Sequence, residues 1–194
     1  MGRPRSKRRA PGASRVRLGR KVPTYDTPYM HVYRCRADFG KASKDYYVIQ
    51  FKPRAGVVIS RGAEVLLVRQ YRFLPNANSW ELPGGSIEPD ESARRAVVRE
   101  CIEETGIRPS RLSLLVTYYP GLDNVDNRTR IYHAAQFEVC APFVPDPLEV
   151  NALRWLPIDQ AIAMVRKGQI LDAMTVTGLL AYASSGKARG KDAS

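Results

Sequence analysis

Apolar and polar residues alternate along much of the first half of the chain in the way that is typical of half-buried β-strands. Residues 30–37 and 45–51 are rich in Tyr, Val and Ile, and the polar, glycine-containing stretch between them predicts an antiparallel hairpin. A second pair of strands is predicted at residues 55–60 and 64–71, where the run 65–68 is apolar on both faces and indicates a central strand. Shorter patterns predict strands at residues 80–82, 112–119, 130–139 and 153–156, and a loop at residues 75–79.

Three segments carry the apolar spacing and the end signals of helices, at residues 92–105, 159–167 and 172–184. The first begins after a proline and stops at Gly106, because glycine is favoured just beyond the C-terminus of a helix. Several strands, one central helix and a helical C-terminus together predict an α+β domain.

The positive charge of the chain is concentrated at its two ends. The net charge is +12, and residues 1–22 carry nine Lys and Arg side chains with no acidic residue. Residues 187–194 carry a net charge of +2, which leaves only +1 for residues 23–186. We therefore expect a disordered basic tail at 1–22, one domain at 23–186 and a second disordered tail at 187–194. The nearly neutral domain does not favour nucleic acid as a partner, and only weak contacts of the basic tail with it are expected.

Two further classes of protein are disfavoured by composition. The chain has no run of about 18 apolar residues and no apolar segment near its N-terminus, so neither a transmembrane helix nor a secretory signal is expected. Its three cysteines, Cys35, Cys101 and Cys140, are widely spaced and odd in number, which predicts reduced thiols in a cytoplasmic protein.

Three carboxylates share one face of the first predicted helix. Each helical residue advances by about 100°, so Glu103 and Glu104 fall on either side of Glu100. These acids repel one another and lie at the negative end of the helix dipole, which is a cost that a bound cation would offset. Carboxylate oxygens suit Mg²⁺ or Mn²⁺. For these three residues alone, a solvated acidic face beside neighbouring arginines remains the alternative.

The residues around this helix follow a fixed spacing that begins at Gly85. The sequence GSIEPDESARRAVVRECIEETGI reads as Gly, five residues, Glu, seven residues, Arg-Glu, an apolar residue, any residue, Glu-Glu, any residue, Gly and an apolar residue. This spacing resembles the Nudix box, and every fixed position is matched. The resemblance implies a Nudix fold, with a mixed β-sheet sandwiched by helices in an α/β/α arrangement. It also implies metal-dependent hydrolysis of a nucleoside diphosphate linked to another moiety.

The resemblance also implies roles for individual residues. Glu100 and Glu104 match the main metal ligands, and Glu103 matches a further ligand or a residue that positions the catalytic water. The main-chain carbonyl of Gly84, just before the box, is expected to join the metal site. Structural or orienting roles are implied for the remaining fixed positions, which are Gly85, Glu91, Arg99 and Gly106.

Motifs outside the box resemble the ADP-ribose and nucleotide-sugar pyrophosphatase branch of the family. They span about residues 28–183 and are QYR at 70–72, WELPGG at 80–85, YPGL at 119–122, LPID at 156–159 and GQILDAMT at 168–175. The resemblance implies a homodimer that converts ADP-ribose to AMP and ribose 5-phosphate. GDP-sugars, UDP-sugars and damaged nucleotides are alternatives, because the loop 121–130 departs from the shorter serine- and glutamate-containing loop of ADP-ribose hydrolases.

Four further residues are candidates outside the box. Arg72 matches a family arginine that contacts the substrate, with a surface ion pair as its alternative role. Glu81 is a candidate for binding substrate hydroxyls or is simply a strand residue. The catalytic base of the branch lies on a loop before the LPID strand end, which points to Glu149, with Asp146 as the second choice. A non-catalytic, nucleotide-sensing Nudix domain is disfavoured because no box carboxylate is lost.

Overall fold

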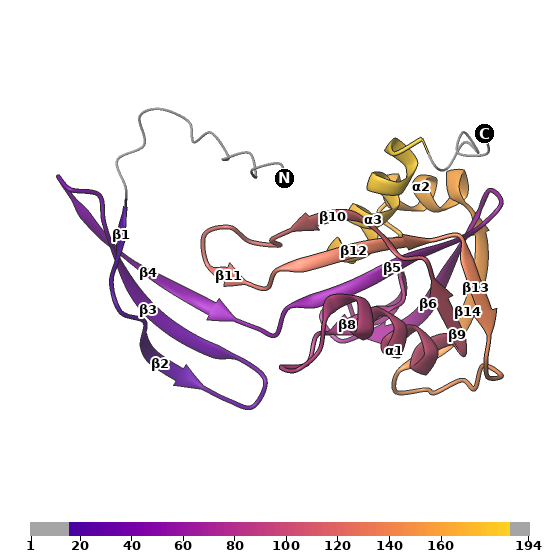
Figure 1. Ribbon diagram of the computed structural model, residues 1–194, viewed down its shortest axis with the longest axis horizontal. Coiled ribbons are helices and arrows are strands. Elements are labelled where there is room, and N and C mark those ends of the chain that lie inside the picture. Colours follow the sequence, from indigo (N-terminus) through magenta and orange to yellow (C-terminus); the bar gives the residue numbers. More distant parts are fainter. Residues whose placement is uncertain (1–15, 187–194) are drawn as a thin grey trace, which may run out of the picture. The chain divides into compact units, whose positions relative to one another are not determined.

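The computed structural model describes residues 16–186, and these form two compact units. One contains the chain up to Phe51 together with residues 123–125, and the other contains residues 52–122 and the chain from Asp126 onward. The boundary at Phe51 lies inside the stretch 23–186 that the sequence suggests is one domain. Figure 1 shows the elements of each unit along the chain.

The first unit is a small antiparallel sheet. Its strands are β1 (Arg17–Leu18), β2 (Val22–Asp26), β3 (His31–Asp38) and β4 (Ser43–Gln50), and the two-residue β11 (Val125–Asp126) is at the edge of the same sheet. The predicted N-terminal hairpin is confirmed, since β3 and β4 pair antiparallel along their whole length, from His31 opposite Gln50 to Asp38 opposite Ser43. Gly40, with φ of 88°, adopts the left-handed conformation in the turn between them.

The tail predicted at residues 1–22 extends too far along the chain, because strands already begin at Arg17 and Val22. Arg17 and Leu18 pair with Asp38 and Ala37 of β3, and Val22 already begins β2. Backbone pairing and an ion pair of 2.9 Å between Arg17 and Asp38 order this stretch although its composition shows no strand periodicity. The rest of that tail, residues 1–15, and the predicted tail at 187–194 lie outside the described residues.

The second unit is built around a seven-stranded mixed sheet. Its central order is β10-β12-β5-β6-β14, with β7 paired to β6 and β8 paired to β5; β12 and β5 run parallel. A separate ribbon joins β9 to β13. The strands are β5 (Arg54–Arg61), β6 (Glu64–Arg72), β7 (Ala77–Glu81), β8 (Gly84–Ser86), β9 (Ile107–Ser110), β10 (Ser113–Tyr118), β12 (Thr129–Ala134), β13 (Gln136–Val139) and β14 (Val150–Pro157).

Helices cover both faces of this sheet, as the predicted α/β/α arrangement requires (Figure 1). The helices are α1 (Ala93–Thr105), α2 (Ile158–Arg166) and α3 (Ala173–Ser184). Alternate residues of β5 serve opposite faces: Val57 and Ile59 pack in the cluster that contains α1, whereas Val58 packs in the cluster that contains α2 and α3. The α+β class and the Nudix arrangement of layers are confirmed.

Two strand predictions differ from the structure. The expected loop at residues 75–79 is partly strand, because β7 begins at Ala77 and pairs with the end of β6. The expected strand at 130–139 is two strands in different sheets, since β12 ends at Ala134 and β13 turns away to pair with β9. In both cases the pairing partner, rather than the local pattern, decides where the strand begins or ends.

Candidate active site

Helix α1 is placed by signals at its two ends. The Ser92 hydroxyl accepts a hydrogen bond of 3.3 Å from the Arg95 N–H and caps the N-terminus. Gly106, with φ of 71°, closes the C-terminus, and its N–H donates to the Ile102 carbonyl. The last two turns of α1 therefore project their carboxylates from a helix with fixed ends.

Two of these carboxylates lie against the glycine turn that precedes the helix. Glu104 accepts hydrogen bonds of 2.9 Å from the Gly84 N–H and from the Gln70 Nε2–H. A Cβ placed on Gly85 would lie 2.5 Å from the carboxylate atoms of Glu100, so only glycine allows this approach. The turn and the helix thus bring together Glu100, Glu104 and the backbone of Gly84.

Glu104 is held in an environment that opposes its ionisation. Burial, with a smaller contribution from the negative charge of Glu100, raises the pKa of Glu104 from 4.5 to about 8. The hydrogen bonds from Gly84 and Gln70 act in the opposite direction but do not cancel the cost of burial. A nearby positive charge would restore the ionised form, which is the condition that a cation-binding carboxylate needs.

Arg99 lies at the centre of the contacts that hold the box together. It binds Glu91 at 2.9 Å, the Ser86 carbonyl at 3.0 Å, Glu100 at 2.8 Å and Glu103 at 3.1 Å. The Glu91 bond lowers the pKa of Glu91 and raises the pKa of Arg99. Arg99 therefore ties the loop before α1 to the carboxylates on it.

The three carboxylates near the end of α1, Glu100, Glu103 and Glu104, do not form one cluster. Within residues 16–186 no three His, Cys, Asp or Glu side chains come together in a way that could hold a metal ion by themselves. The side chain of Glu103 is 58% exposed and turns toward Arg99, whereas Glu104 turns inward. Glu100 and Glu104 remain as carboxylate donors. This number suits a divalent cation such as Mg²⁺, which proteins bind through one or two carboxylates while substrate phosphates and waters supply the other ligands.

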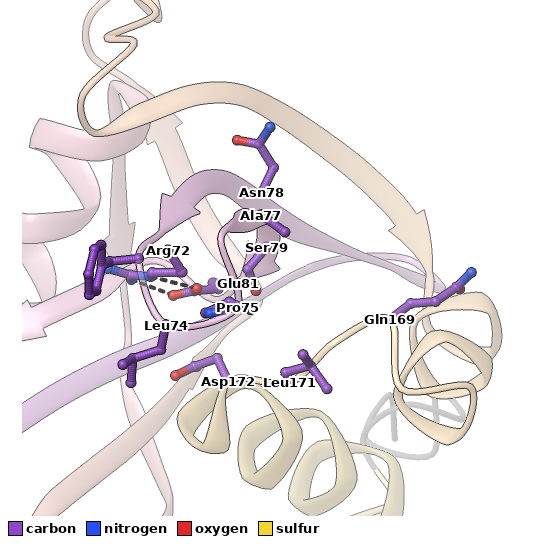
Figure 2. Close-up of a pocket in the computed structure, with 11 residues that line it drawn as sticks. Arg72, Leu74, Pro75, Ala77, Asn78, Ser79, Glu81, Gln169, Leu171 and Asp172 are labelled. Carbon is purple, nitrogen blue, oxygen red and sulfur yellow. Dashed lines mark hydrogen bonds and ion pairs between the residues drawn. The ribbon is translucent and has the colours of Figure 1, made fainter.

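Arg72 and Glu81 form a partly buried ion pair on the β6–β7 hairpin. Glu81 is 2% exposed, and its two carboxylate oxygens accept hydrogen bonds of 2.7 and 2.5 Å from Arg72. Figure 2 shows this pair beside Asp172 in the wall of a pocket of about 310 Å³. Glu81 and Asp172 both raise the pKa of Arg72, so its guanidinium is a fixed cation at the pocket.

The pocket also contains residues to which the sequence assigned no part in a site. Leu74, Pro75 and Leu171 give it an apolar side (Figure 2). Asp172 caps the N-terminus of α3 by accepting a hydrogen bond from the Thr175 N–H, and it also faces the pocket. Gln70 belongs to the QYR motif, but its contact with Glu104 becomes evident only in the tertiary structure.

The structure places Glu149 in the bend immediately before β14, which begins at Val150. Val150 pairs with Gln70, which contacts Glu104, so Glu149 is one residue from this junction. Glu149 is exposed. Asp146 instead stabilises its own turn, since its side chain accepts a hydrogen bond of 2.7 Å from the Leu148 N–H.

Comparison with protein families and relatives agrees with this geometry. The NUDIX domain model matches residues 50–174. A CMP-5'-(N-acetyl-N-hydroxy-3-aminopropyl)phosphonate hydrolase of Streptomyces rubellomurinus is 34% identical over 142 residues, which cover 71% of this chain and 67% of the relative. An ADP-ribose pyrophosphatase of Mycobacterium tuberculosis is 29% identical over 136 residues, covering 69% and 66%. The chain thus spans about two thirds of the length of each relative.

Solved structures share the fold. A crystal structure of an ADP compounds hydrolase superposes with a TM-score of 0.76 over 93% of this chain and 99% of the other, at 16% identity. A MutT Nudix hydrolase from Burkholderia pseudomallei superposes with a TM-score of 0.53 over 69% of this chain and 97% of the other, at 28% identity.

The motifs outside the box indicated similarity to ADP-ribose pyrophosphatases, and the mycobacterial relative confirms that similarity. No helix within residues 16–186 has the length and apolar character needed to cross a membrane. With an intact box, the matched domain and these relatives, the chain belongs to the Nudix hydrolase family and is a pyrophosphohydrolase.

Proposed function

We propose that this enzyme hydrolyses ADP-ribose to AMP and ribose 5-phosphate. The observation that carries the proposal is the pairing of two features in one unit: carboxylates packed on the Gly84–Gly85 turn, and a pocket whose cation is Arg72. The first suits a diphosphate, and the second offers a charged and an apolar side to the remainder of a nucleotide. The similarity to an ADP-ribose pyrophosphatase supports the choice of substrate.

The carboxylates define where the diphosphate would lie. A divalent cation, Mg²⁺ or Mn²⁺, held by Glu100, Glu104 and the Gly84 carbonyl would neutralise phosphoryl oxygens and lower the pKa of a water. Arg99 donates a hydrogen bond to the carboxylate of Glu100 and so holds it in place near Glu104 despite the repulsion between the two negative charges. Glu103 is more exposed and is also bound to Arg99. Its proposed role is therefore to position water rather than to bind the cation directly.

Glu149 is the proposed general base. Its carboxylate is exposed and lies one residue from the strand register that brings Gln70 to Glu104. Asp146 is less suited, since its side chain already stabilises a turn.

Arg72 is the proposed contact for a substrate phosphate or ribose, and Glu81 holds it in place. Glu81 is only 2% exposed and both of its oxygens already accept hydrogen bonds from Arg72, so substrate hydroxyls have little access to it. Glu81 is therefore a positioning residue in this proposal, and Arg72 keeps its remaining N–H donors for the ligand.

The substrate is tested with a panel assayed in Mg²⁺ and in ¹⁸O-water, followed by mass spectrometry of both products. The panel contains ADP-ribose, GDP-mannose, a UDP-sugar, 8-oxo-dGTP and a CMP-linked phosphonate. ADP-ribose should have the highest kcat/KM, and the labelled product identifies the phosphorus that is attacked. Equal or faster turnover of another member would replace ADP-ribose as the substrate.

The roles of the acids are tested by matched variants. Glu104→Gln should lower kcat by several powers of ten, since it removes a metal ligand, and Glu149→Gln should lower kcat about 100-fold with little effect on KM. Asp146→Asn is the control for Glu149, because it changes a neighbouring acid on the same loop. Loss of activity in Asp146→Asn with full activity in Glu149→Gln would reverse the assignment.

A homodimer remains part of the proposal. The branch resemblance implies that substrate residues come from two subunits, and light scattering coupled to size-exclusion chromatography measures the mass directly. A monomer with full activity on ADP-ribose would show that hydrolysis does not require a dimer, and the proposed chemistry would be unaffected.

A further inference from the structure

A second pocket lies at the other end of α1 from Glu100 and Glu104. It has a volume of about 550 Å³, and its walls include the first turn of α1, the loop that precedes it, and one face of β12. We call it the arginine pocket, after Arg94, Arg128 and Arg130, which line it together with Tyr132. The ten residues from Arg94 to Glu104 correspond to about 15 Å along a helix, so this pocket is distinct from the carboxylate site.

The three arginines are brought together by the fold. Arg128, Arg130 and Tyr132 lie at alternate positions on and just before β12, so their side chains share the sheet face that α1 covers. Arg94 comes from α1; its guanidinium lies 5.3 Å from the centre of the Tyr132 ring and donates to the Leu112 carbonyl. Stacking and this bond hold Arg94 in one orientation.

The backbone beside Arg128 is also fixed. The Arg128 carbonyl accepts a hydrogen bond of 3.1 Å from the Arg54 N–H, and the Asn127 side chain donates to the Lys52 carbonyl at 2.6 Å. The segment that carries Arg128 is thereby attached to the start of β5. The pocket is a preformed surface of the second unit.

The positive charge in the pocket is not compensated by its own acids. Glu88 and Glu91 also line it, but Glu88 is paired with Lys52 at 2.7 Å and Glu91 with Arg99 at 2.9 Å. Within residues 16–186, none of the three arginines makes an ion pair with a carboxylate. Three like charges around one cavity repel each other, and an anionic ligand would relieve that cost.

The first turn of α1 adds to the same potential. It contains no acidic residue, so no carboxylate within that turn offsets the positive end of the helix dipole. Backbone N–H groups of a first helical turn that lack intrahelical partners can donate to a bound anion. The arginines and the helix end therefore favour the same class of ligand.

We propose that the arginine pocket binds a small molecule that carries a phosphate or oligophosphate group. The guanidinium fork suits phosphate oxygens, and the volume is within the range of small-molecule sites. Glu91 lines the pocket and also binds Arg99, which binds Glu100, so a ligand here contacts the same network that holds the catalytic helix. This inference does not depend on the identity of the hydrolysed substrate.

Inorganic tripolyphosphate is the probe, titrated into the full chain in EDTA so that the box carboxylates hold no cation. Two-dimensional ¹H–¹⁵N NMR follows the amide signals of residues 93–95, which report this pocket separately from the basic termini. Arg128→Gln and Arg130→Gln should each raise the dissociation constant about tenfold or more, because each removes a charge-assisted contact. The control is Arg95→Gln, on the same helical turn but outside the pocket lining, which should change it less than about twofold.

Several results would overturn the inference. Unshifted amides at residues 93–95 in the wild type would show that no anion binds there. Equal weakening by Arg95→Gln would mean that general surface charge, rather than a pocket, attracts the probe. Tighter binding of a 5'-hydroxyl RNA oligonucleotide through the same arginines would make nucleic acid the ligand.

Activity separates this site from the catalytic one. Hydrolysis by Arg128→Gln and Arg130→Gln should stay within about threefold of the wild type, as expected for surface changes away from the carboxylates. Glu104→Gln should lose hydrolysis and still bind tripolyphosphate in the arginine pocket. Loss of both properties together in the arginine variants would assign these residues to the active site and refute a second site.

Discussion

Replacing Glu104 with glutamine tests the burial of this carboxylate, because the variant keeps the shape of the side chain but cannot ionise. Burial raises the pKa of Glu104 from 4.5 to about 8 in the metal-free protein. Between these values the unfolded chain releases a proton that the folded chain retains, so stability falls as pH rises and the full cost is reached above the folded pKa. Linkage through this one group makes the protein about 3 kcal/mol less stable at pH 8.5 than at pH 5.5.

The assay is urea unfolding in EDTA at these two pH values. Between the two pH values, the free energy of unfolding of the wild type should fall by about 3 kcal/mol more than that of Glu104→Gln. Glu149→Gln, whose carboxylate is exposed, should show the same fall as the wild type. Comparing the pH difference within each variant cancels any mismatch between the new amide and the donors on Gly84 and Gln70. Wild-type and Glu104→Gln profiles that stay parallel within about 0.5 kcal/mol would refute the burial of Glu104 against the glycine turn.

Three further substitutions test the surroundings of the site. Gly85→Ala would place a Cβ 2.5 Å from the Glu100 carboxylate, so the carboxylate must turn away and kcat should fall about 100-fold while the melting temperature changes little; unchanged kinetics would contradict the close approach. Glu81→Gln removes the charge that orients Arg72, and steady-state kinetics should show KM raised about tenfold with kcat nearly constant, whereas a loss confined to kcat would argue for a direct role in chemistry. Ser92→Ala removes the cap of α1 and should cost about 1 kcal/mol in urea unfolding, and an unaffected midpoint would mean that the cap contributes nothing.

Features that depend on near neighbours in the chain were predictable. The limits of α1 follow from Ser92 and Gly106, whose effects on the backbone are local. The shared face of Glu100 and Glu104 follows from the helical repeat alone. The β3–β4 hairpin and the central position of β6 follow from the period and the apolar character of their residues.

Features that depend on pairing between distant segments were decided by the tertiary structure. The sequence cannot indicate that β1 begins at Arg17, because that strand exists only through its partner β3. The same holds for β7, whose pairing with β6 buries Glu81 and brings it into contact with Arg72.

The box itself shows both contributions. Its spacing determined which carboxylates lie on one side of α1, but not which of them would be buried. Packing against the Gly84–Gly85 turn and Gln70 buries Glu104, and the contact with Arg99 leaves Glu103 at the surface. Periodicity is a property of a single helix, whereas burial and ionisation depend on the surfaces that surround it.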